Sequence, residues 1–515
     1  MLPSPSSSPL QTPTLYNSTN LRRKGNEDDN RRKSSHPWLQ LPTPPTNTKR
    51  PFEEDSSPSK RARLTAKYES RLNESEETLV ERARTRFRRS ACPPLSMARN
   101  DLPSYSPILN NISTRPILQS FVSSYKSDFF RCDSVENGLL TPPYACSYSH
   151  SAKAGRTSHL AVSTEEGAVH IFDTRKRSEW DPEPSRTTLR PHDNGVYDVK
   201  WSASDSRLAT CSADRSIRIS CIDTSQVLHT LTGHASSVKR AAWHPSNDSL
   251  VCSGGRDGMI CIWDLRIRQS NAIGQSPVFN IPDAHESLMP SGRRTKQHTP
   301  KTITNLILNE GMNLVSSGSS DGVLRYWDLR FLSSSTMRST AKSKRFTPSL
   351  YTPTDPTTLH GSRRPRGILS LTEGIGPSSG LLFALGADSR IHTYVASSLS
   401  SLPISFTDPN IQVNGSFYIS SAVSPCGEWL ATGGGKSALL FDIAAAAKPY
   451  ARASPGVELK AQTGEVYAVD WADGMLASCA DDRTVRIWRP DVDVYRSCLE
   501  DPDNYKWKWS WSVDS

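Results

Sequence analysis

Three residues within one short stretch could do chemistry. His234, Ser253 and Asp257 are the residue types of a hydrolytic Ser-His-Asp triad. Their spacing argues against catalysis, because a catalytic site occurs once in a chain whereas this arrangement recurs. A Ser or Thr stands four residues before an Asp at Thr210/Asp214, Ser253/Asp257, Ser317/Asp321 and Ser478/Asp482. The pattern predicts a repeated structural unit, and we expect no catalytic residue and no enzyme activity.

The repeated residues are predicted to form hydrogen-bond networks. His192, His234 and His285 precede their units, where each can bridge the turn Asp to the strand hydroxyl and satisfy buried polar groups. The predicted structural network is His192, Thr210, Asp214, His234, Ser253, Asp257, His285, Ser317, Asp321, Ser478 and Asp482. The sequence has no Gly-rich phosphate loop and no metal-spaced His/Cys cluster, so neither a cofactor nor a metal is expected.

The elements that position these residues are short strands that recur along the chain. Gly254–Arg266 reads as a tight Asp-Gly turn followed by an alternating apolar strand that ends in Trp263-Asp264. Copies at Ser319–Arg330 and Ala480–Arg489 indicate a repeat protein. Seven such units predict an all-β fold, a seven-bladed β-propeller. Their Trp-Asp positions, or the equivalents, are Phe172-Asp173, Ser220-Cys221, Trp263-Asp264, Trp327-Asp328, Tyr394-Val395, Phe441-Asp442 and Trp488-Arg489.

Two intervals between units are long and are interpreted as loop insertions, at residues 286–300 and 331–366. Both are expected to join an outer strand to the next inner strand, and so to flank the face that carries the Asp turns. Their basic residues are Arg293, Arg294, Lys296, Lys342, Lys344, Arg345, Arg363, Arg364 and Arg366.

Composition divides the chain into three parts. Only 35% of its 515 residues are apolar and 37 are Pro, which favours a folded core with a disordered arm. Of the net charge of +10, residues 1 to 100 hold +8, since they carry 19 Lys/Arg and 11 Asp/Glu. We expect a disordered Ser/Pro-rich basic arm at 1–114, the propeller at 115–490 and a Trp-containing tail at 491–515.

The arm also carries signals of location. Lys49-Arg50 and Lys60-Arg61-Ala62-Arg63 resemble a bipartite nuclear import signal, although a solvated charge run is the alternative. Ser57, which precedes Pro58 between these clusters, is a candidate phosphorylation site. Ten cysteines without a C-x-x-C pair indicate reduced intracellular thiols, and no apolar run approaches a membrane span. A soluble nuclear protein without membrane contact is expected.

Several runs carry a resemblance to a known family. His192–Trp201, Gly233–Trp243 and Gly254–Arg266 are similar to successive blades of the denticleless family. Further matches are Asp283–His285, Leu314–Arg330, Ser416–Ser421 with Ser424-Pro425, and Glu465–Arg489. The resemblance covers about residues 117 to 490. The expected hydroxyl is replaced by Val162, Ala384 and Ala431 in three units, and the His by Gln462 in the last.

The resemblance implies a non-catalytic substrate receptor of a cullin-4 RING ubiquitin ligase. One face would dock on the ligase's linker subunit, and the other would present replication-phase and cell-cycle proteins bound to the sliding clamp. The alternative is a chromatin or ribonucleoprotein scaffold, in which basic segments contact nucleic acid directly.

The two faces have different candidate residues. Trp263, Asp264, Arg266, Trp327, Asp328 and Arg330 resemble a linker-docking motif, because two guanidiniums on adjacent blades could grip carboxylates or carbonyls. An ion pair within each blade is the alternative. On the opposite face, cations beside the Asp turns could attract an acidic target segment, unless they only pair with the turn aspartates. These cations are Arg215, Arg256 and Arg483.

Either end of the chain could close the ring. We expect Ile117–Ser124 to supply the outer strand of the seventh blade, because closure removes an open sheet edge. The competing closer is the tail, where Trp507, Trp509 and Trp511 alternate with polar residues and should share one face of an extended segment. Packing of these indoles on the flank of the propeller is the favoured interpretation, and capture of a partner is the alternative.

Overall fold

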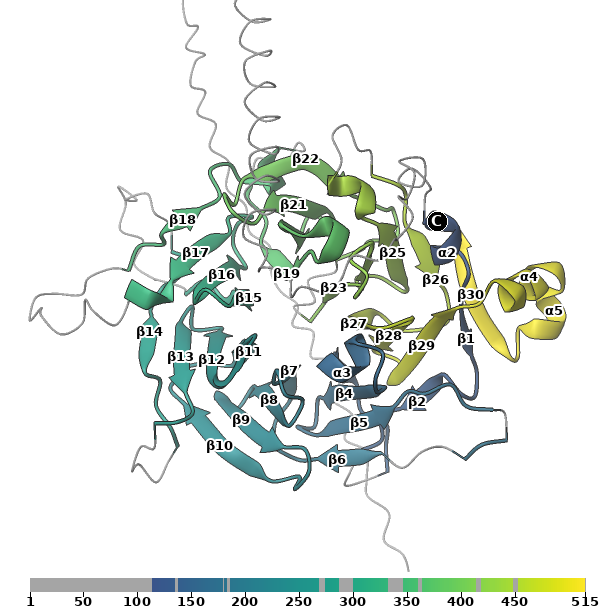
Figure 1. Cartoon of the computed structure of the whole chain (residues 1–515), viewed down its shortest axis with the longest axis horizontal. Coiled ribbons are helices and arrows are strands. Elements are labelled where there is room, and N and C mark those ends of the chain that lie inside the picture. Colours follow the sequence, from purple (N-terminus) through teal and green to yellow (C-terminus); the bar gives the residue numbers. More distant parts are fainter. Residues whose placement is uncertain are drawn as a thin grey trace, which may run out of the picture. The chain divides into compact units, whose positions relative to one another are not determined.

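Antiparallel strands dominate the computed structural model, which describes residues 114–134, 138–178, 180–182, 186–267, 274–286, 300–331, 346–359, 364–413, 418–447 and 453–514. The strands form sheets arranged in a ring, so the chain folds as an all-β propeller (Figure 1). Short turns join neighbouring strands, as antiparallel pairing allows.

Five sheets have four strands each, and each is called a blade below and named by its strands. Their strands are β3 Pro143–Tyr148, β4 His159–Thr164, β5 Val169–Asp173 and β6 Thr187–Leu189; β7 Val196–Trp201, β8 Arg207–Ser212, β9 Ser216–Cys221 and β10 Val227–Thr232; β11 Val238–His244, β12 Asn247–Gly255, β13 Ile260–Asp264 and β14 Phe279–Ile281; β15 Ile303–Leu308, β16 Asn313–Gly318, β17 Arg325–Asp328 and β18 Leu350–Tyr351; β19 Ile368–Glu373, β20 Leu381–Gly386, β21 Ile391–Val395 and β22 Ser401–Phe406.

The sixth sheet has ten strands and joins both ends of the described chain. Its path is β23 Ser421–Val423, β24 Trp429–Thr432, β25 Ala438–Asp442, β26 Val457–Leu459, β30 Trp509–Asp514, β1 Phe121–Ser124, β29 Thr484–Pro490, β28 Met475–Ala480 and β27 Val466–Ala472, with β2 Phe129–Arg131 paired to β29. The helices are α2 Arg115–Leu118, α3 His150–Lys153, α4 Val492–Glu500 and α5 Pro502–Tyr505, with 3-10 turns η2 Leu329–Phe331, η4 Pro356–Thr358, η5 Gly376–Ser378 and η6 Ala444–Ala447.

The seven predicted Trp-Asp positions all lie in strands. Five of them end the third strands of the four-stranded blades, and two lie in β25 and β29 of the large sheet. The indoles of Trp263, Trp327 and Trp488 are buried, and apolar clusters join neighbouring blades. In one such cluster Cys252 and Ile260 pack with Leu306 of the next blade. The blades therefore stabilise one another, as expected for a repeat fold.

Each blade has two ends, which define the two faces of the ring. We call the end at which the second strand turns into the third the turn face. The first strands begin at the turn face, because Val196 pairs with Ser212 and Val238 pairs with Gly255. The opposite end, where the third strands finish with the Trp-Asp positions, is called the exit face.

Both ends of the described chain supply strands to the ring, whereas only one of them was expected to close it. Val122 in β1 pairs with Arg489 and also with Trp511, so β1 and β30 form one seam between β29 and β26. The predicted outer strand at Ile117–Ser124 is right only from Phe121 onward. Residues 115–118 form α2 instead, because Pro116 lacks an amide proton for pairing and fits the first turn of a helix.

The second long interval, residues 331–366, is not a single insertion between blades. The strand β18 lies within it, so residues 332–349 connect β17 to β18 from the exit face, and only 352–367 lead to the next first strand. The expectation that this whole interval flanks the turn face was wrong, because a two-residue strand leaves no periodic signal in a sequence. The interval at 286–300 does join β14 to β15.

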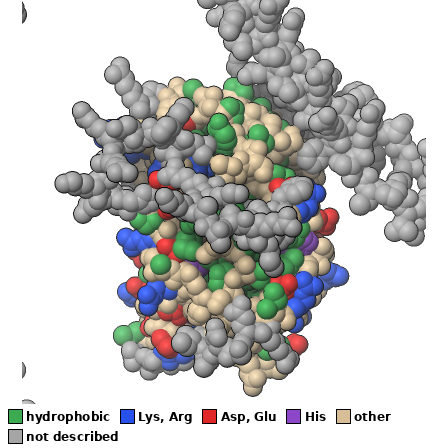
Figure 2. All heavy atoms as spheres, turned by 90° about the vertical axis from the view of Figure 1, so that its left-hand side faces the viewer, with side chains coloured by type: hydrophobic (Ala, Val, Ile, Leu, Met, Phe, Trp, Pro, Cys, Tyr) green, Lys and Arg blue, Asp and Glu red, His purple; other side chains and the backbone are tan. Residues whose placement is uncertain are grey.

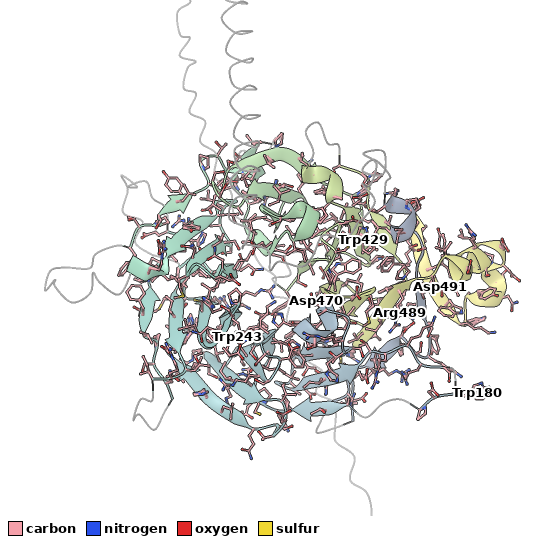
Figure 3. All side chains as sticks on the ribbon, viewed as in Figure 1. Trp180, Trp243, Trp429, Asp470, Arg489 and Asp491 are labelled. Carbon is pink, nitrogen blue, oxygen red and sulfur yellow. The ribbon has the colours of Figure 1, made fainter. Side chains whose placement is uncertain are left out.

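The outer surface is mixed in character. On the side that carries β14 and β18, apolar side chains interleave with charged ones (Figure 2). Trp180 lies at the periphery of the ring and is 90% exposed (Figure 3). The nine described cysteines form no disulfide. Among the described residues, none of the helices has the length and apolar character needed to cross a bilayer.

Candidate functional site

The β11–β14 blade holds a continuous chain of hydrogen bonds from an indole to a carboxylate. Trp263 Nε1 donates to Ser253 Oγ over 2.8 Å, and Ser253 Oγ lies 2.9 Å from His234 Nε2. His234 Nδ1 lies 3.0 Å from Asp257. Burial of Asp257 opposes its ionisation, but the hydrogen bond and charge of His234 together with hydrogen bonds from the Met259 and Ala235 amides lower its pKa.

The β7–β10 blade has a shorter version of the same network. His192 lies between Asp214, at 2.7 Å, and Thr210, at 2.9 Å. Ser220 stands where the other blade has its indole, so the hydroxyl receives no Trp donor. Burial opposes ionisation of Asp214, yet hydrogen bonds from His192 and Ser216 lower its pKa to about 2.

The β15–β18 blade corrects two predicted members of the network, Ser317 and Asp321. Trp327 Nε1 donates to Ser316 Oγ over 2.9 Å, and His285 Nε2 lies 2.8 Å from the same oxygen. Ser317, the predicted partner, instead lies 3.0 Å from Thr304 Oγ1.

The reason is the length of the turn between the second and third strands. Trp327 pairs with Leu314 and Trp263 with Val251, so the turn after Ser316 is one residue longer than the turn after Ser253. The longer turn also removes Asp321 from His285. Asp321 lies 3.7 Å from Lys301 instead, and His285 Nδ1 has no hydrogen-bond partner among the described residues.

In the β27–β29 part of the large sheet, Gln462 takes the place of the histidine. Ser478 Oγ donates to Gln462 Oε1 over 2.7 Å and accepts from Trp488 Nε1 over 3.0 Å. Asp482 binds the Thr463 amide and the Thr484 hydroxyl. The hydroxyl residues at the centre of these networks are fully buried, which suits a role in packing: Thr210, Ser253, Ser316 and Ser478.

On the exit face, two arginines form forked ion pairs with the aspartates of their own blades. Arg266 donates through Nε and Nη2 to Asp264, over 2.9 and 2.7 Å, and Arg330 does the same to Asp328, over 2.9 and 2.6 Å. These bonds lower the pKa of both aspartates. The ion pair within the blade is therefore present, yet the side chains of Arg266 and Arg330 remain 65% and 58% exposed.

A third fork of the same kind was missed at the sequence level. Arg175 donates through Nε and Nη2 to Asp173, over 2.9 and 2.6 Å, and its side chain is 79% exposed. The signal was available, because Asp173 and Arg175 have the same Asp-x-Arg spacing as the other two pairs. The exit face therefore carries forks at the ends of β5, β13 and β17.

The three arginines of the turn face are exposed and differ in position. Arg215 and Arg483 follow their turn aspartates with φ of 70° and 68°, whereas Arg256 precedes Asp257. The described residues record no ion pair between any of these arginines and a turn aspartate, because those carboxylates bind histidines, hydroxyls and amides instead.

Six first strands share a bulge at their second residue, close to the turn face. The pairing register shifts across that residue in β3, β7, β11, β15, β19 and β27. A bulge leaves its extra residue unpaired and redirects its side chain. The bulge residues are Tyr144, Tyr197, Lys239, Thr304, Leu369 and Tyr467.

Aromatic side chains cluster among these bulge residues. Tyr418, which precedes β23, stacks on Tyr144 with centroids 4.6 Å apart and on Tyr197 at 5.4 Å. The Lys239 ammonium lies 3.5 Å from the centroid of the Tyr197 ring and 5.2 Å from that of Tyr418. This cluster was not predicted from the sequence, although Tyr144, Tyr197 and Lys239 each stand one position after the start of a first strand.

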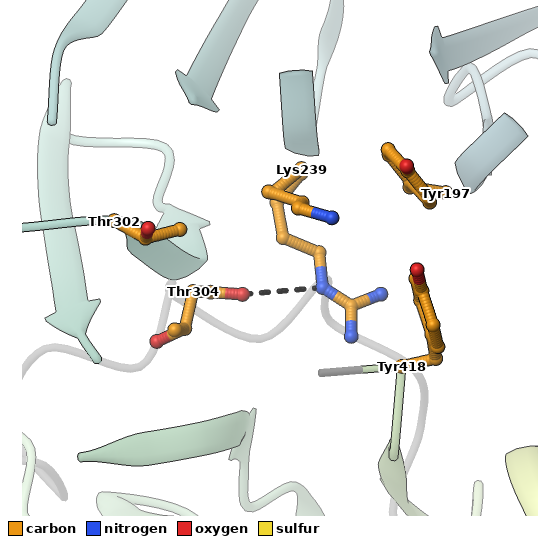
Figure 4. A pocket seen from close by; sticks show the side chains of 6 residues that line it. Tyr197, Lys239, Thr302, Thr304 and Tyr418 are labelled. Carbon is orange, nitrogen blue, oxygen red and sulfur yellow. Dashed lines mark hydrogen bonds between the residues drawn. The ribbon is translucent and has the colours of Figure 1, made fainter. Parts of the chain in front are cut away.

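A pocket opens beside Lys239 (Figure 4). It leaves about 10 Å3 open to a water-sized group and is lined by Tyr197, Lys239, Arg240, Thr302, Thr304 and Tyr418. Arg240 is buried, donates to the Thr304 carbonyl over 3.2 Å and pairs with Asp198 at 3.2 Å. Burial, together with the neighbouring Arg256 and Arg240, lowers the pKa of Lys239 to about 8.

The tail tryptophans do not share one environment. Trp507 lies in a turn before β30 and is 77% exposed, whereas Trp509 and Trp511 lie in the strand and are partly buried. The expectation that all three lie in one extended segment was wrong for Trp507, because residues 506–508 form a turn after α5. Ser510 and Ser512 face inward, toward Arg486 and the Gln119 carbonyl.

Several predicted sites lie outside the described residues. These are the import clusters at Lys49, Arg50, Lys60, Arg61 and Arg63, the phosphorylation candidate Ser57, and most basic residues of the two long intervals.

Comparisons with known proteins place the chain among WD-repeat proteins. A family model described as WD domain, G-beta repeat matches residues 183–219, 225–264 and 454–489. "Cell division cycle protein cdt2" of Schizosaccharomyces pombe is 31% identical over 360 residues, which are 66% of this chain and 68% of that protein.

Animal relatives match over a similar part of the chain. "Denticleless protein homolog" of Homo sapiens is 27% identical over 412 residues, 75% of this chain and 52% of that protein. "Protein lethal(2)denticleless" of Drosophila melanogaster is 30% identical over 353 residues, 65% of this chain and 43% of that protein. The chain therefore spans about half the length of these animal relatives. Among solved structures, a chain from "Crystal Structure of Mitotic Checkpoint Complex" aligns with a TM-score of 0.49 and 17% identity, over 78% of this chain and 99% of that chain.

Proposed function

Because this chain belongs to the denticleless family of WD-repeat proteins, we propose that it is the substrate-recognition subunit of a cullin-4 RING ubiquitin ligase. In this role it performs no chemistry itself. It docks on the linker subunit of the ligase and presents replication-phase and cell-cycle proteins for ubiquitination, with the sliding clamp as the platform on which they are bound. The nucleus is the expected location, since these targets act on DNA.

We infer that the ring has seven blades. The large sheet contributes two of them, β23–β26 and β27–β29, because each half contains one predicted Trp-Asp position. The strands β30 and β1 then lie between the two halves and join them.

The forked Arg–Asp ion pairs of the exit face support the proposal that this face docks on the linker. Each aspartate holds its guanidinium in one orientation, so little side-chain entropy is lost when a partner binds. The planar guanidinium then presents its outer N–H groups to carbonyls or carboxylates of the linker. Arg266 and Arg330 are the predicted core of this surface, and Arg175 extends it.

The double variant Arg266→Ala, Arg330→Ala tests this proposal in the full-length protein. We expect co-purification of the linker and cullin-4 from replicating cells to be lost. Stability should change little, since exposed ion pairs contribute little to folding. Arg215→Ala, Arg256→Ala is the matched control, because it removes two exposed arginines from the other face. Undiminished linker recovery with the folded double variant would refute docking through these residues.

The second candidate function is a chromatin or ribonucleoprotein scaffold. The observation that favours it is the net charge of +8 in residues 1 to 100. Direct binding of bare DNA would weaken steeply as salt rises, because each neutralised phosphate releases counterions. Salt-sensitive DNA binding without recovery of cullin or linker would support the scaffold instead.

A further inference from the structure

The pocket beside Lys239 presents donors and cations without a matching acceptor. Lys239 has no carboxylate within ion-pair distance among the described residues, and its ammonium contacts only tyrosine faces. Asp198 is committed to Arg240, at 3.2 Å, and to the Ala241 amide, at 3.0 Å. The Tyr418 hydroxyl stays protonated, since burial and the nearby tyrosines raise its pKa to about 12. The lining therefore lacks the negative charge that would balance its cations.

We propose that this pocket binds the anionic tip of one target side chain, a carboxylate or a phosphate. The inference deepens the proposed function and rests on it, because it names the anchor point of the target on the turn face. An anion beside Lys239 would neutralise the ammonium charge, which no described carboxylate balances. Their attraction would be stronger than in water, because the site is partly desolvated.

The geometry supports an anchor for a side chain rather than a small-molecule site. Only about 10 Å3 of the pocket is open to a water-sized group, far below the roughly 300–1,000 Å3 of small-molecule sites. Lys239 and Tyr197 are bulge residues, so their side chains point away from the pairing plane of their strands. A rigid blade fixes each of them, which reduces the entropy cost of binding.

Charge also decides which part of the bulge cluster takes the anion. After burial, Asp481 and Glu465 raise the pKa of Tyr467, so they lie on the side of β27. Glu165 lies beside Tyr144 and also raises the pKa of Tyr418. Arg256 and Arg240 lie on the side of β11, close to Lys239. An acidic target segment would therefore be repelled from β27 and attracted toward β11.

Lysine labelling of the full-length protein tests the proposal. Reductive methylation at pH 7, read by mass spectrometry, would be run with inorganic phosphate, a blocked tetraglutamate peptide or a blocked tetralysine peptide at constant ionic strength. We expect phosphate or tetraglutamate to slow modification of Lys239 about threefold when the probe is at about twice its dissociation constant. The probe that protects Lys239 more strongly at equal concentration shows whether the pocket prefers a phosphate or a carboxylate.

Lys301 is the matched control, because it lies on the same face but is 3.7 Å from Asp321. Its labelling should not respond to either anion. Equal protection of Lys301, protection by tetralysine, or no protection of Lys239 by either anion would overturn the proposal. Protection by duplex DNA alone would do so as well.

Lys239→Met separates this inference from the proposed function. The variant should keep normal recovery of the linker through the exit face and should stabilise targets in cells. Normal target turnover with normal linker binding would refute the anchor and leave the receptor role intact. If the wild-type protein bound no linker at all, the receptor role would be refuted, whatever the result for the Lys239→Met variant.

Discussion

At the scale of single residues, the blades reuse one chemical unit and vary its parts. The histidine in the β7–β10 and β11–β14 blades bridges a hydroxyl and a carboxylate, whereas Gln462 binds the hydroxyl and the carbonyl of Ser478 and groups of Thr484. In the β19–β22 blade His392 lies on the third strand and contacts Asp388 at 3.0 Å. What persists is the satisfaction of buried polar groups, not the identity of the residues.

Ser316→Ala should destabilise the protein more than Ser317→Ala. Loss of the Ser316 hydroxyl leaves Trp327 Nε1 and His285 Nε2 without a partner, and an unsatisfied buried group costs about 1–3 kcal/mol. Ser317→Ala removes one bond to Thr304, which contributes about 0.5–1.5 kcal/mol. The free energy of unfolding, measured in urea, checks this order. A larger loss for Ser317→Ala would contradict the assigned register.

His170 should make stability depend on pH in the mildly acidic range. Burial, with Arg186 nearby, lowers its pKa from 6.5 to about 4. The unfolded chain therefore binds a proton that the folded chain does not, so its contribution is complete above pH 6.5 and falls as pH drops toward 4. The loss amounts to up to about 3 kcal/mol. His170→Gln should flatten this part of the profile in urea unfolding between pH 7 and 4, and an unchanged slope would show that another group is responsible.

At the scale of elements, the seam between β26 and β29 is the distinctive feature. Two strands from opposite ends of the chain, β1 and β30, pair with each other and fill the seam. Arg489, near the end of β29 and next to this seam, donates to Asp128 and to the Thr174 carbonyl (Figure 3). Closure covers backbone groups that an open edge would expose to other chains.

Phe121→Ala should loosen this seam. The ring is fully buried and packs edge-on against Trp429 and Trp471, with centroids 6.1 and 5.6 Å away. Truncation of a buried Phe costs about 3–5 kcal/mol, so we expect a lower urea midpoint and more aggregation. Tyr125→Ala is the control, because that ring is 52% exposed and should change stability by less than about 1 kcal/mol. Equal effects of both variants would argue that β1 does not hold the ring together.

At the scale of the whole molecule, the two faces offer different chemistry. The exit face presents arginines already neutralised by their own aspartates, whereas the turn face presents cations whose neighbouring carboxylates are bound elsewhere. The Arg–Asp pairs of the exit face suit a close interface with directional hydrogen bonds. The cations of the turn face suit long-range attraction of an acidic partner. A receptor that holds one partner and captures another requires both.

The triple variant Arg215→Glu, Arg256→Glu, Arg483→Glu should separate these faces. Charge reversal at the turn face should slow capture of acidic targets and so extend target half-life in replicating cells, while linker recovery stays normal. Pulse-chase of targets and co-purification of the linker measure the two effects. Rapid turnover of targets by a folded, nuclear triple variant would place recognition on another surface.

The sequence alone was enough for the repeat, the third strands and most of the buried networks. The reason is that an Asp turn followed by an alternating strand ending in Trp-Asp is a local pattern, set by turn geometry and side-chain alternation. The ion pairs of Arg266 and Arg330 were only the alternative to a docking motif, and the strand from Phe121 to Ser124 was expected from the need to close the ring rather than from such a pattern. Even the missed fork at Arg175 was visible as a spacing.

Tertiary structure alone decided what depends on register and on contacts between distant segments. One extra turn residue moved the network from Ser317 to Ser316, and spacing could not show where that residue was added. The seam required β30 to meet β1 although 385 residues separate Ser124 from Trp509 in the chain. The pocket beside Lys239 brings together side chains from β7, β11 and the segment before β23. Closure of the ring creates such neighbours, and local sequence carries no signal of closure.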